Sequence, residues 1–135
     1  MIRVQAIDHI VLRTTDVARL VAFYSDVLGC DVERTLPAET GLTQLRAGSA
    51  LIDIIDVDSS LGRAGGEAPT AKGNNLDHFC LRIEAMEQDA LTDWLQSKGI
   101  EPGTFETRYG AEGFGPSIYI TDPDHNTVEL RFTTK

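Results

Sequence analysis

The stretch Ile7-Asp8-His9-Ile10-Val11-Leu12-Arg13 returns, little altered, as Leu76-Asp77-His78-Phe79-Cys80-Leu81-Arg82. The two histidines stand 69 positions apart (78 − 9), which is about half of the 135-residue chain. A repeat on this scale predicts one structural module that is used twice. The chain has 3 histidines, His9, His78 and His125, so the duplication places two of them at matching points, where they can converge on one site.

The charge balance restricts the kinds of partner. The chain has 12 Lys and Arg residues against 21 Asp and Glu residues, a formal net charge of −9. A field of this sign repels phosphate backbones and anionic lipid surfaces, so we expect no nucleic acid and no membrane partner. No apolar stretch approaches the roughly 20 residues of a membrane span, and we expect a cytoplasmic protein. Cys30 and Cys80 allow at most one bridge and are predicted to be free thiols.

Hydrophobic periodicity predicts a strand, a helix and three more strands in the first half of the chain. Alternation over residues 5–13 puts His9 and Arg13 on one face of a strand. Apolar residues at helical spacing from Val17 onward predict a helix that ends at Gly29. Three further strands are expected over residues 31–36, 42–47 and 50–56, so module one spans residues 5–56.

The same order of elements is predicted again in the second half. Residues 57–74 are rich in glycine, lack a periodic apolar pattern and are predicted to form a linker. Module two is then expected over residues 75–133, with a strand over 75–83, a helix over 86–98 and strands near 104–109, 117–121 and 127–132.

Two details of module two carry expectations of their own. Its helix is predicted to bury Leu91, Trp94 and Leu95. The Gly-rich stretch over residues 109–116 is predicted to be a flexible loop that acts as a lid.

Two β-α-β-β-β modules that each open with Asp-His, followed by a final hairpin over residues 119–130 (YITDPDHNTVEL), resemble the vicinal oxygen chelate superfamily. Its members include glyoxalase I, the fosfomycin and bleomycin resistance proteins, methylmalonyl-CoA epimerase and the extradiol dioxygenases. The resemblance covers nearly the whole chain. It implies an α+β fold in which two tandem modules form curved mixed sheets, an incomplete barrel, within a single glyoxalase-like domain over residues 1–135.

In that superfamily, the first and last strands of each module supply metal ligands. The resemblance implies His9, His78 and Glu129 as ligands in this chain. Two imidazoles and a carboxylate suit Zn, Ni, Mn or Fe(II) and leave positions open for substrate oxygens. A lone strand histidine is more often a hydrogen-bonded structural residue, but the repeated Asp-His with a matching downstream Glu favours ligation.

Two further residues are judged against the same pattern. Matching the strand that contains Asp53 to the strand that contains Glu129 makes Asp53 the fourth donor. Superfamily members such as glyoxalase I have Glu or Gln there, so direct ligation by the shorter Asp and ligation through water both stay open. His125 stands where the superfamily usually has Gly, and it is predicted to be an exposed turn residue rather than a ligand.

Three side chains are candidates for contact with substrate. Arg13 and Arg82 lie four residues beyond the two histidines on the same strand faces, where each either binds an anionic group or pairs with an acidic side chain. Tyr119 is placed to donate a hydrogen bond to substrate or to pack in the core.

The resemblance implies a metal-dependent glyoxalase-like enzyme with lyase or isomerase chemistry on a small substrate, in which Glu129 or Asp53 moves a proton between adjacent carbons. An extradiol-type dioxygenase and a metal-free bleomycin-resistance-like binding protein are the alternatives. The dioxygenases normally carry another histidine several residues before the tyrosine, where this chain has Ala111, Glu112 and Gly113. A homodimer is expected, since two-module chains of this superfamily usually dimerise.

Overall fold

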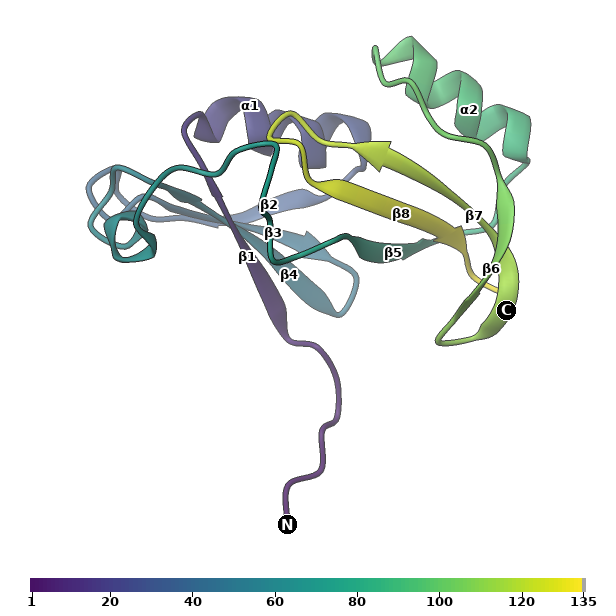
Figure 1. Ribbon diagram of the computed structural model, residues 1–135, viewed down its shortest axis with the longest axis horizontal. Helices are drawn as coiled ribbons and strands as arrows, with labels where there is room; N and C mark the ends of the chain where they lie inside the picture. The colour runs from purple at the N-terminus through teal and green to yellow at the C-terminus, as the bar shows by residue number, and fades with distance from the viewer. Residues whose placement is uncertain (135) are drawn as a thin grey trace. The chain divides into compact units, whose positions relative to one another are not determined.

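The computed structural model describes residues 1–134, in which eight strands form two four-stranded sheets (Figure 1). The chain divides into two compact units, Met1–Pro69 and Thr70–Lys135. Each unit contains one strand, one helical segment and three further strands in that order. This arrangement confirms the predicted α+β fold of two tandem modules.

The first unit builds its sheet in the order β1-β4-β3-β2. Its elements are β1 (His9–Thr14), α1 (Val17–Ala22), a π-helical turn (Phe23–Val27), β2 (Asp31–Thr35), β3 (Leu42–Ala47), β4 (Ala50–Asp56) and a 3₁₀ turn (Gly62–Gly65). β1 runs parallel to β4, and the other neighbours are antiparallel. β4 is therefore an interior strand, and β1 is an edge strand.

The helical segment follows the predicted apolar stripe and ends at the predicted glycine. The Asp16 carboxylate caps α1 by accepting a hydrogen bond of 3.0 Å from the backbone N–H of Arg19. Leu20 and Tyr24 are fully buried, as helical spacing requires. Gly29 takes a φ of +73°, a left-handed conformation in which glycine is favoured at the end of a helix.

The second unit repeats this topology with a sheet in the order β5-β8-β7-β6. Its elements are β5 (Phe79–Ile83), α2 (Gln88–Ser97), β6 (Glu106–Gly110), β7 (Gly113–Thr121) and β8 (Thr127–Phe132). β5 runs parallel to β8, as β1 does to β4. The repeat seen in the sequence is thus a repeat of structure.

Strand register makes the two modules equivalent residue by residue. Val11 lies opposite Asp53 in the first sheet, and Cys80 lies opposite Glu129 in the second. Since Val11 and Cys80 each stand two residues after the histidine of their module, Asp53 and Glu129 occupy matching places. Both carboxylates lie on interior strands and are almost completely buried.

Two predictions about module two are wrong. The Gly-rich stretch is not a flexible loop, because β6 and β7 pair as far as Gly110 and Gly113 and leave a two-residue turn between them. Gly113 has a φ of +92°, so its glycine serves a tight hairpin. Trp94 is 45% exposed, because Leu91 and Leu95 alone form the buried stripe and Trp94 lies beside it, under the Lys98 ammonium.

Residue 125, in the turn between β7 and β8, has a backbone conformation that favours glycine. His125 has a φ of +68° and is exposed, which confirms the predicted turn position. The Asp122 carboxylate holds the turn by accepting hydrogen bonds from the backbone N–H groups of Asp124 and Asn126, at 2.8 and 2.9 Å. Within residues 1–134, no helix is long and apolar enough to cross a membrane.

The left-handed conformation of His125 predicts that His125→Gly stabilises the protein. A side chain in this region costs roughly 1–2 kcal/mol, and the greater freedom of glycine in the unfolded chain returns roughly 0.5–1 kcal/mol of that. We expect a net gain of about 0.5–1 kcal/mol in the free energy of unfolding, measured by urea denaturation. His125→Ala keeps the strain and should show no gain. A His125→Gly variant less stable than the wild type would contradict the left-handed conformation of residue 125.

Candidate functional site

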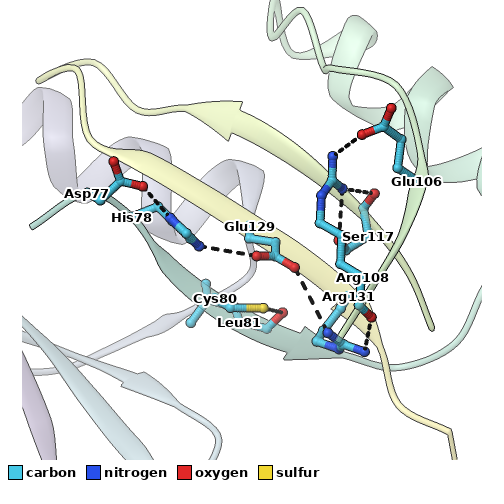
Figure 2. Close-up of polar contacts among 9 residues, drawn as sticks. All are labelled: Asp77, His78, Cys80, Leu81, Glu106, Arg108, Ser117, Glu129 and Arg131. Carbon is cyan, nitrogen blue, oxygen red and sulfur yellow. Dashed lines mark hydrogen bonds and ion pairs between the residues drawn. The ribbon is translucent and has the colours of Figure 1, made fainter. Parts of the chain in front are cut away.

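The predicted ligands of module two meet on one face of the second sheet (Figure 2). Glu129 lies on β8 and His78 lies just before β5, and the distance from His78 Nε2 to Glu129 Oε1 is 3.3 Å. On its other side, His78 Nδ1 lies 2.7 Å from the carboxylate of Asp77. The imidazole therefore spans two carboxylates.

This geometry determines which ring nitrogen can bind a metal ion. When Nδ1 donates its hydrogen to Asp77, the neutral ring of His78 presents the Nε2 lone pair to Glu129. A lone pair and a carboxylate oxygen repel each other unless a proton or a cation lies between them. Metal-bound histidines commonly carry such a carboxylate on the second nitrogen, which fixes the tautomer and the orientation of the ring.

Module one presents a matching pair in its own sheet. His9 Nδ1 lies 2.6 Å from the Asp8 carboxylate, as His78 does from Asp77. This hydrogen bond raises the pKa of His9; desolvation partly opposes the increase, and the charge of Asp53 adds a smaller increase. His9 thus lies within electrostatic reach of Asp53.

A residue with a polar side chain lies opposite each buried carboxylate on the next strand. Gln44 lies opposite Asp53, and its amide donates hydrogen bonds to the two carboxylate oxygens at 3.2 and 3.1 Å. Tyr119 lies opposite Glu129, and its ring packs edge-on against the ring of His78 at 5.3 Å. Burial, and then the charge of Glu129, raise the pKa of the Tyr119 hydroxyl. Gln44 was missed from the sequence, although strand pairing alone could have placed it.

Of the four predicted donors, the structure brings His78 and Glu129 into contact. Within residues 1–134, no group of three or more His, Cys, Asp or Glu side chains lies close enough to hold a metal ion. His78 and Glu129 belong to the second unit, and His9 and Asp53 belong to the first. Each unit thus contributes one histidine and one carboxylate to the list of predicted donors.

A cavity of about 280 Å³ adjoins the pair in module two. Its lining runs along the strands from His78 and Glu129 to Arg82 and Arg131. Residues 109–111 of the β6–β7 hairpin add a further wall. The second unit thus offers a pocket of small-molecule size next to the predicted metal ligands.

Arg131 was missed from the sequence and is the most deeply buried cation of the cavity wall. It is 5% exposed, and it follows Glu129 by two residues on the same face of β8. Its guanidinium donates a hydrogen bond of 2.8 Å to the carbonyl of Gly113 and lies 4.0 Å from Glu129. The alternation of β8 could have revealed it, because Glu129 and Arg131 share a strand face.

The three predicted substrate contacts differ in their surroundings. Arg13 does not pair with a carboxylate, because its guanidinium donates hydrogen bonds to the backbone carbonyls of Gly62, Gly66 and Glu67. Arg82 lines the cavity, and its Nε lies 3.3 Å from Glu112. Tyr119 stands beside Glu129, as described above. Arg13 thus holds the linker segment to β1. Arg82 lies beside the pocket, where contact with a substrate is possible.

Cys80 also lines the cavity, and burial together with the charge of Glu129 raises the pKa of its thiol to about 11. Because the thiolate is the reactive form, iodoacetamide should modify this thiol only slowly near neutral pH. In a Cys30→Ala background, the rate should rise about tenfold per pH unit between about pH 7 and about pH 10. Glu129→Gln should increase the rate at fixed pH, because it removes a negative charge that disfavours the thiolate. Modification as fast as that of free cysteine would contradict this prediction.

The family relationship follows from comparison with known sequences. A family model for the Glyoxalase/Bleomycin resistance protein/Dioxygenase superfamily matches residues 6–130. The chain belongs to this superfamily. The match confirms the resemblance drawn from the Asp-His repeat. Among curated proteins, the virulence protein STM3117 of Salmonella typhimurium (strain LT2) is similar, with 29% identity over 128 residues that cover 94% of this chain and 83% of that protein.

Solved structures agree with the superfamily assignment. The fosfomycin resistance protein FosX of Listeria monocytogenes is similar in fold, with a TM-score of 0.70 at 22% identity, covering 98% of this chain and 96% of that one. Lactoylglutathione lyase of Agrobacterium tumefaciens has a TM-score of 0.67 at 26% identity, covering 94% of this chain and 92% of that one.

Proposed function

We propose that this chain is a metal-dependent glyoxalase-type enzyme with lyase or isomerase chemistry on a small substrate that presents adjacent oxygens. The 3.3 Å contact between His78 Nε2 and Glu129 Oε1 at the cavity wall carries the proposal. Two ligands about 2.1 Å from a tetrahedral ion lie roughly 3.4 Å apart, so the pair has a separation typical of metal ligands. The likeness to a lactoylglutathione lyase supports the choice of chemistry.

The proposed donors are His9, His78 and Glu129, with Asp53 as the fourth. Two imidazoles and carboxylate oxygens form a set that suits Zn, Ni, Mn or Fe(II). The hydrogen bonds from the ring Nδ1 atoms to Asp8 and Asp77 support metal ligation by the two histidines, because they leave the lone pair of each Nε2 atom available to a metal ion.

A bound divalent ion would supply Lewis acidity to the substrate oxygens. Glu129 is the proposed base that moves a proton between neighbouring carbons of the substrate. Tyr119 lies opposite Glu129 on the next strand, and Arg131 lies 4.0 Å from Glu129, so both are placed to orient its carboxylate. The burial of Glu129 limits the access of water to the reacting proton. Asp53, held by Gln44, is the alternative base.

We further propose a homodimer as the working form. β1 and β5 are edge strands of their sheets, and an edge strand offers a row of backbone donors and acceptors to a second chain. The donor set divided between two modules can then be completed within one chain or between two chains. Light scattering should give twice the mass of the chain, and a monomeric mass at working concentration would contradict the homodimer.

The test is to load the protein separately with Zn, Ni, Mn and Fe(II) under argon, then to measure metal stoichiometry and turnover of a hemithioacetal. We expect one metal ion per donor set and turnover that chelation removes and metal restores. Stoichiometric Fe(II) with cleavage of catechol would favour the dioxygenase alternative instead. Failure to bind any of the four metals would overturn the proposal in favour of a metal-free binding protein.

A further inference from the structure

Two arginines lie opposite each other in the register of neighbouring strands of the second sheet. Arg82 on β5 is the register partner of Arg131 on β8, and both line the cavity. Two like charges close together repel each other, so the pair is not explained by stability alone. At the matching place in module one, Arg13 lies opposite Ile55, so the repeat itself does not require two cations.

The cavity lining is positive within a strongly acidic chain. Its charged side chains are Arg82, Arg131 and Glu129, which sum to +1 (2 − 1), whereas the whole chain has a formal net charge of −9. Glu112 lies outside the lining, and its carboxylate lies 3.3 Å from Arg82 Nε. If Glu129 binds a divalent cation, its charge no longer offsets the two guanidinium groups.

The hairpin leaves room for the buried cation. A Cβ added at Gly110 would lie 2.2 Å from Arg131 Nη1, and one added at Gly115 would lie 3.3 Å from Nη2. Arg131 is anchored by its hydrogen bond to the carbonyl of Gly113. The glycines of β6 and β7 thus permit the guanidinium to occupy the cavity wall, where a larger residue would displace it.

We propose that Arg82 and Arg131 form a subsite for an anionic group, so that the substrate is a small molecule with a carboxylate or a comparable anion beyond its chelating oxygens. This inference rests on the proposed function, because it assigns the substrate class of the same site. Arg131 stands two residues beyond Glu129 on the same face of β8, and its guanidinium lies 4.0 Å from the Glu129 carboxylate, so the anion subsite adjoins the proposed base. Arginine binds such groups through paired charge-assisted hydrogen bonds.

The test compares two probes of equal carbon number on the Zn-loaded protein by isothermal titration calorimetry. 2-Oxoglutarate carries a second carboxylate beyond its chelating end, and 2-oxopentanoate has a methyl group in that place. We expect 2-oxoglutarate to bind roughly tenfold or more tightly, as a charge-assisted pair of hydrogen bonds implies. The preference should fall to about one in Arg82→Gln and in Gly110→Ala, which displaces the Arg131 guanidinium without removing its charge.

Arg46→Gln is the matched control, because Arg46 is also a half-exposed arginine on a strand, paired with Glu33, but lies in module one. It should keep the full preference. Equal binding of both probes by the metal-loaded wild type would overturn the anion subsite while the proposed metal function stands. An equal loss of the preference for 2-oxoglutarate in Arg46→Gln would also overturn the anion subsite, since the preference would then depend on the net charge of the protein.

A second titration separates this inference from the proposed function. Inorganic phosphate needs no metal ion, and the metal-free wild type should bind it weakly, as followed by chemical shift changes, whereas Arg82→Gln should not. If no metal binds but phosphate binding depends on Arg82, the proposed function fails and the anion subsite stands. If the metal-free protein binds no phosphate and no metal can be loaded, both fail.

Discussion

A His78→Ala variant is expected to bind divalent metal at least about 100-fold more weakly than the wild type, with its fold intact. Mutation of a residue that hydrogen-bonds to a metal ligand already lowers metal affinity by about 10–100-fold, and removal of the ligand itself lowers the affinity further. His78 is about one-third exposed and lies before β5 rather than inside it, so its truncation leaves little cavity. Affinity is measured by competition with a chromophoric chelator, and folding by circular dichroism.

His125→Ala is the matched control, because His125 is the histidine that the structure places in an exposed turn. It should retain the affinity of the wild type. Glu129→Gln, which keeps the shape of the side chain, should remove turnover and leave the protein folded. Metal affinity unchanged in His78→Ala would contradict the assigned ligand role, and full activity in Glu129→Gln would contradict the role of Glu129 as base.

The second large effect is expected for Gly62→Ala, which should lower the free energy of unfolding by about 3 kcal/mol or more. A Cβ at this position would lie 1.8 Å from the backbone carbonyl oxygen of Asp56 and 2.7 Å from the Cα of Val57. Both atoms belong to the backbone at the end of β4, so no side-chain rotation can relieve the clash. Urea denaturation measures the loss.

Gly103→Ala is the control that measures the effect of a Gly→Ala substitution without a backbone clash. A Cβ at Gly103 would meet the carbonyl oxygen of Tyr119 at 3.4 Å, an ordinary contact, and its effect should stay within about 1 kcal/mol. If the Gly62→Ala variant is as stable as the Gly103→Ala variant, the result would contradict the close packing of the 3₁₀ turn against the end of β4.

The repeat made the topology predictable, because two similar Asp-His strands fix where each module begins. The prediction failed where spacing does not determine geometry. A run of glycines is compatible with both a loop and a tight hairpin, and only the pairing of Tyr109 with Phe114 decides for the hairpin. Trp94 was assigned to the helix core because it lies within the spacing of the stripe, although its ring falls at the exposed edge.

The candidate site was predictable in its ligand types but not in its supporting contacts. His78 and Glu129 were identified from the resemblance, and the structure puts them 3.3 Å apart. Gln44 and Arg131 were missed, because each acts through a partner on a neighbouring strand and neither belongs to a repeated motif. Such residues can be found only after strand register is known.

The two modules use an arginine at equivalent positions in different ways. Arg13 and Arg82 occupy equivalent positions, yet Arg13 binds three backbone carbonyls of the connecting segment and Arg82 faces a cavity. After a duplication, one copy of a residue is free to diverge while the other preserves the scaffold. In this chain the Arg13 copy is structural, so the ligand preference of the pocket can change through the Arg82 copy without loss of the contacts that hold the connecting segment.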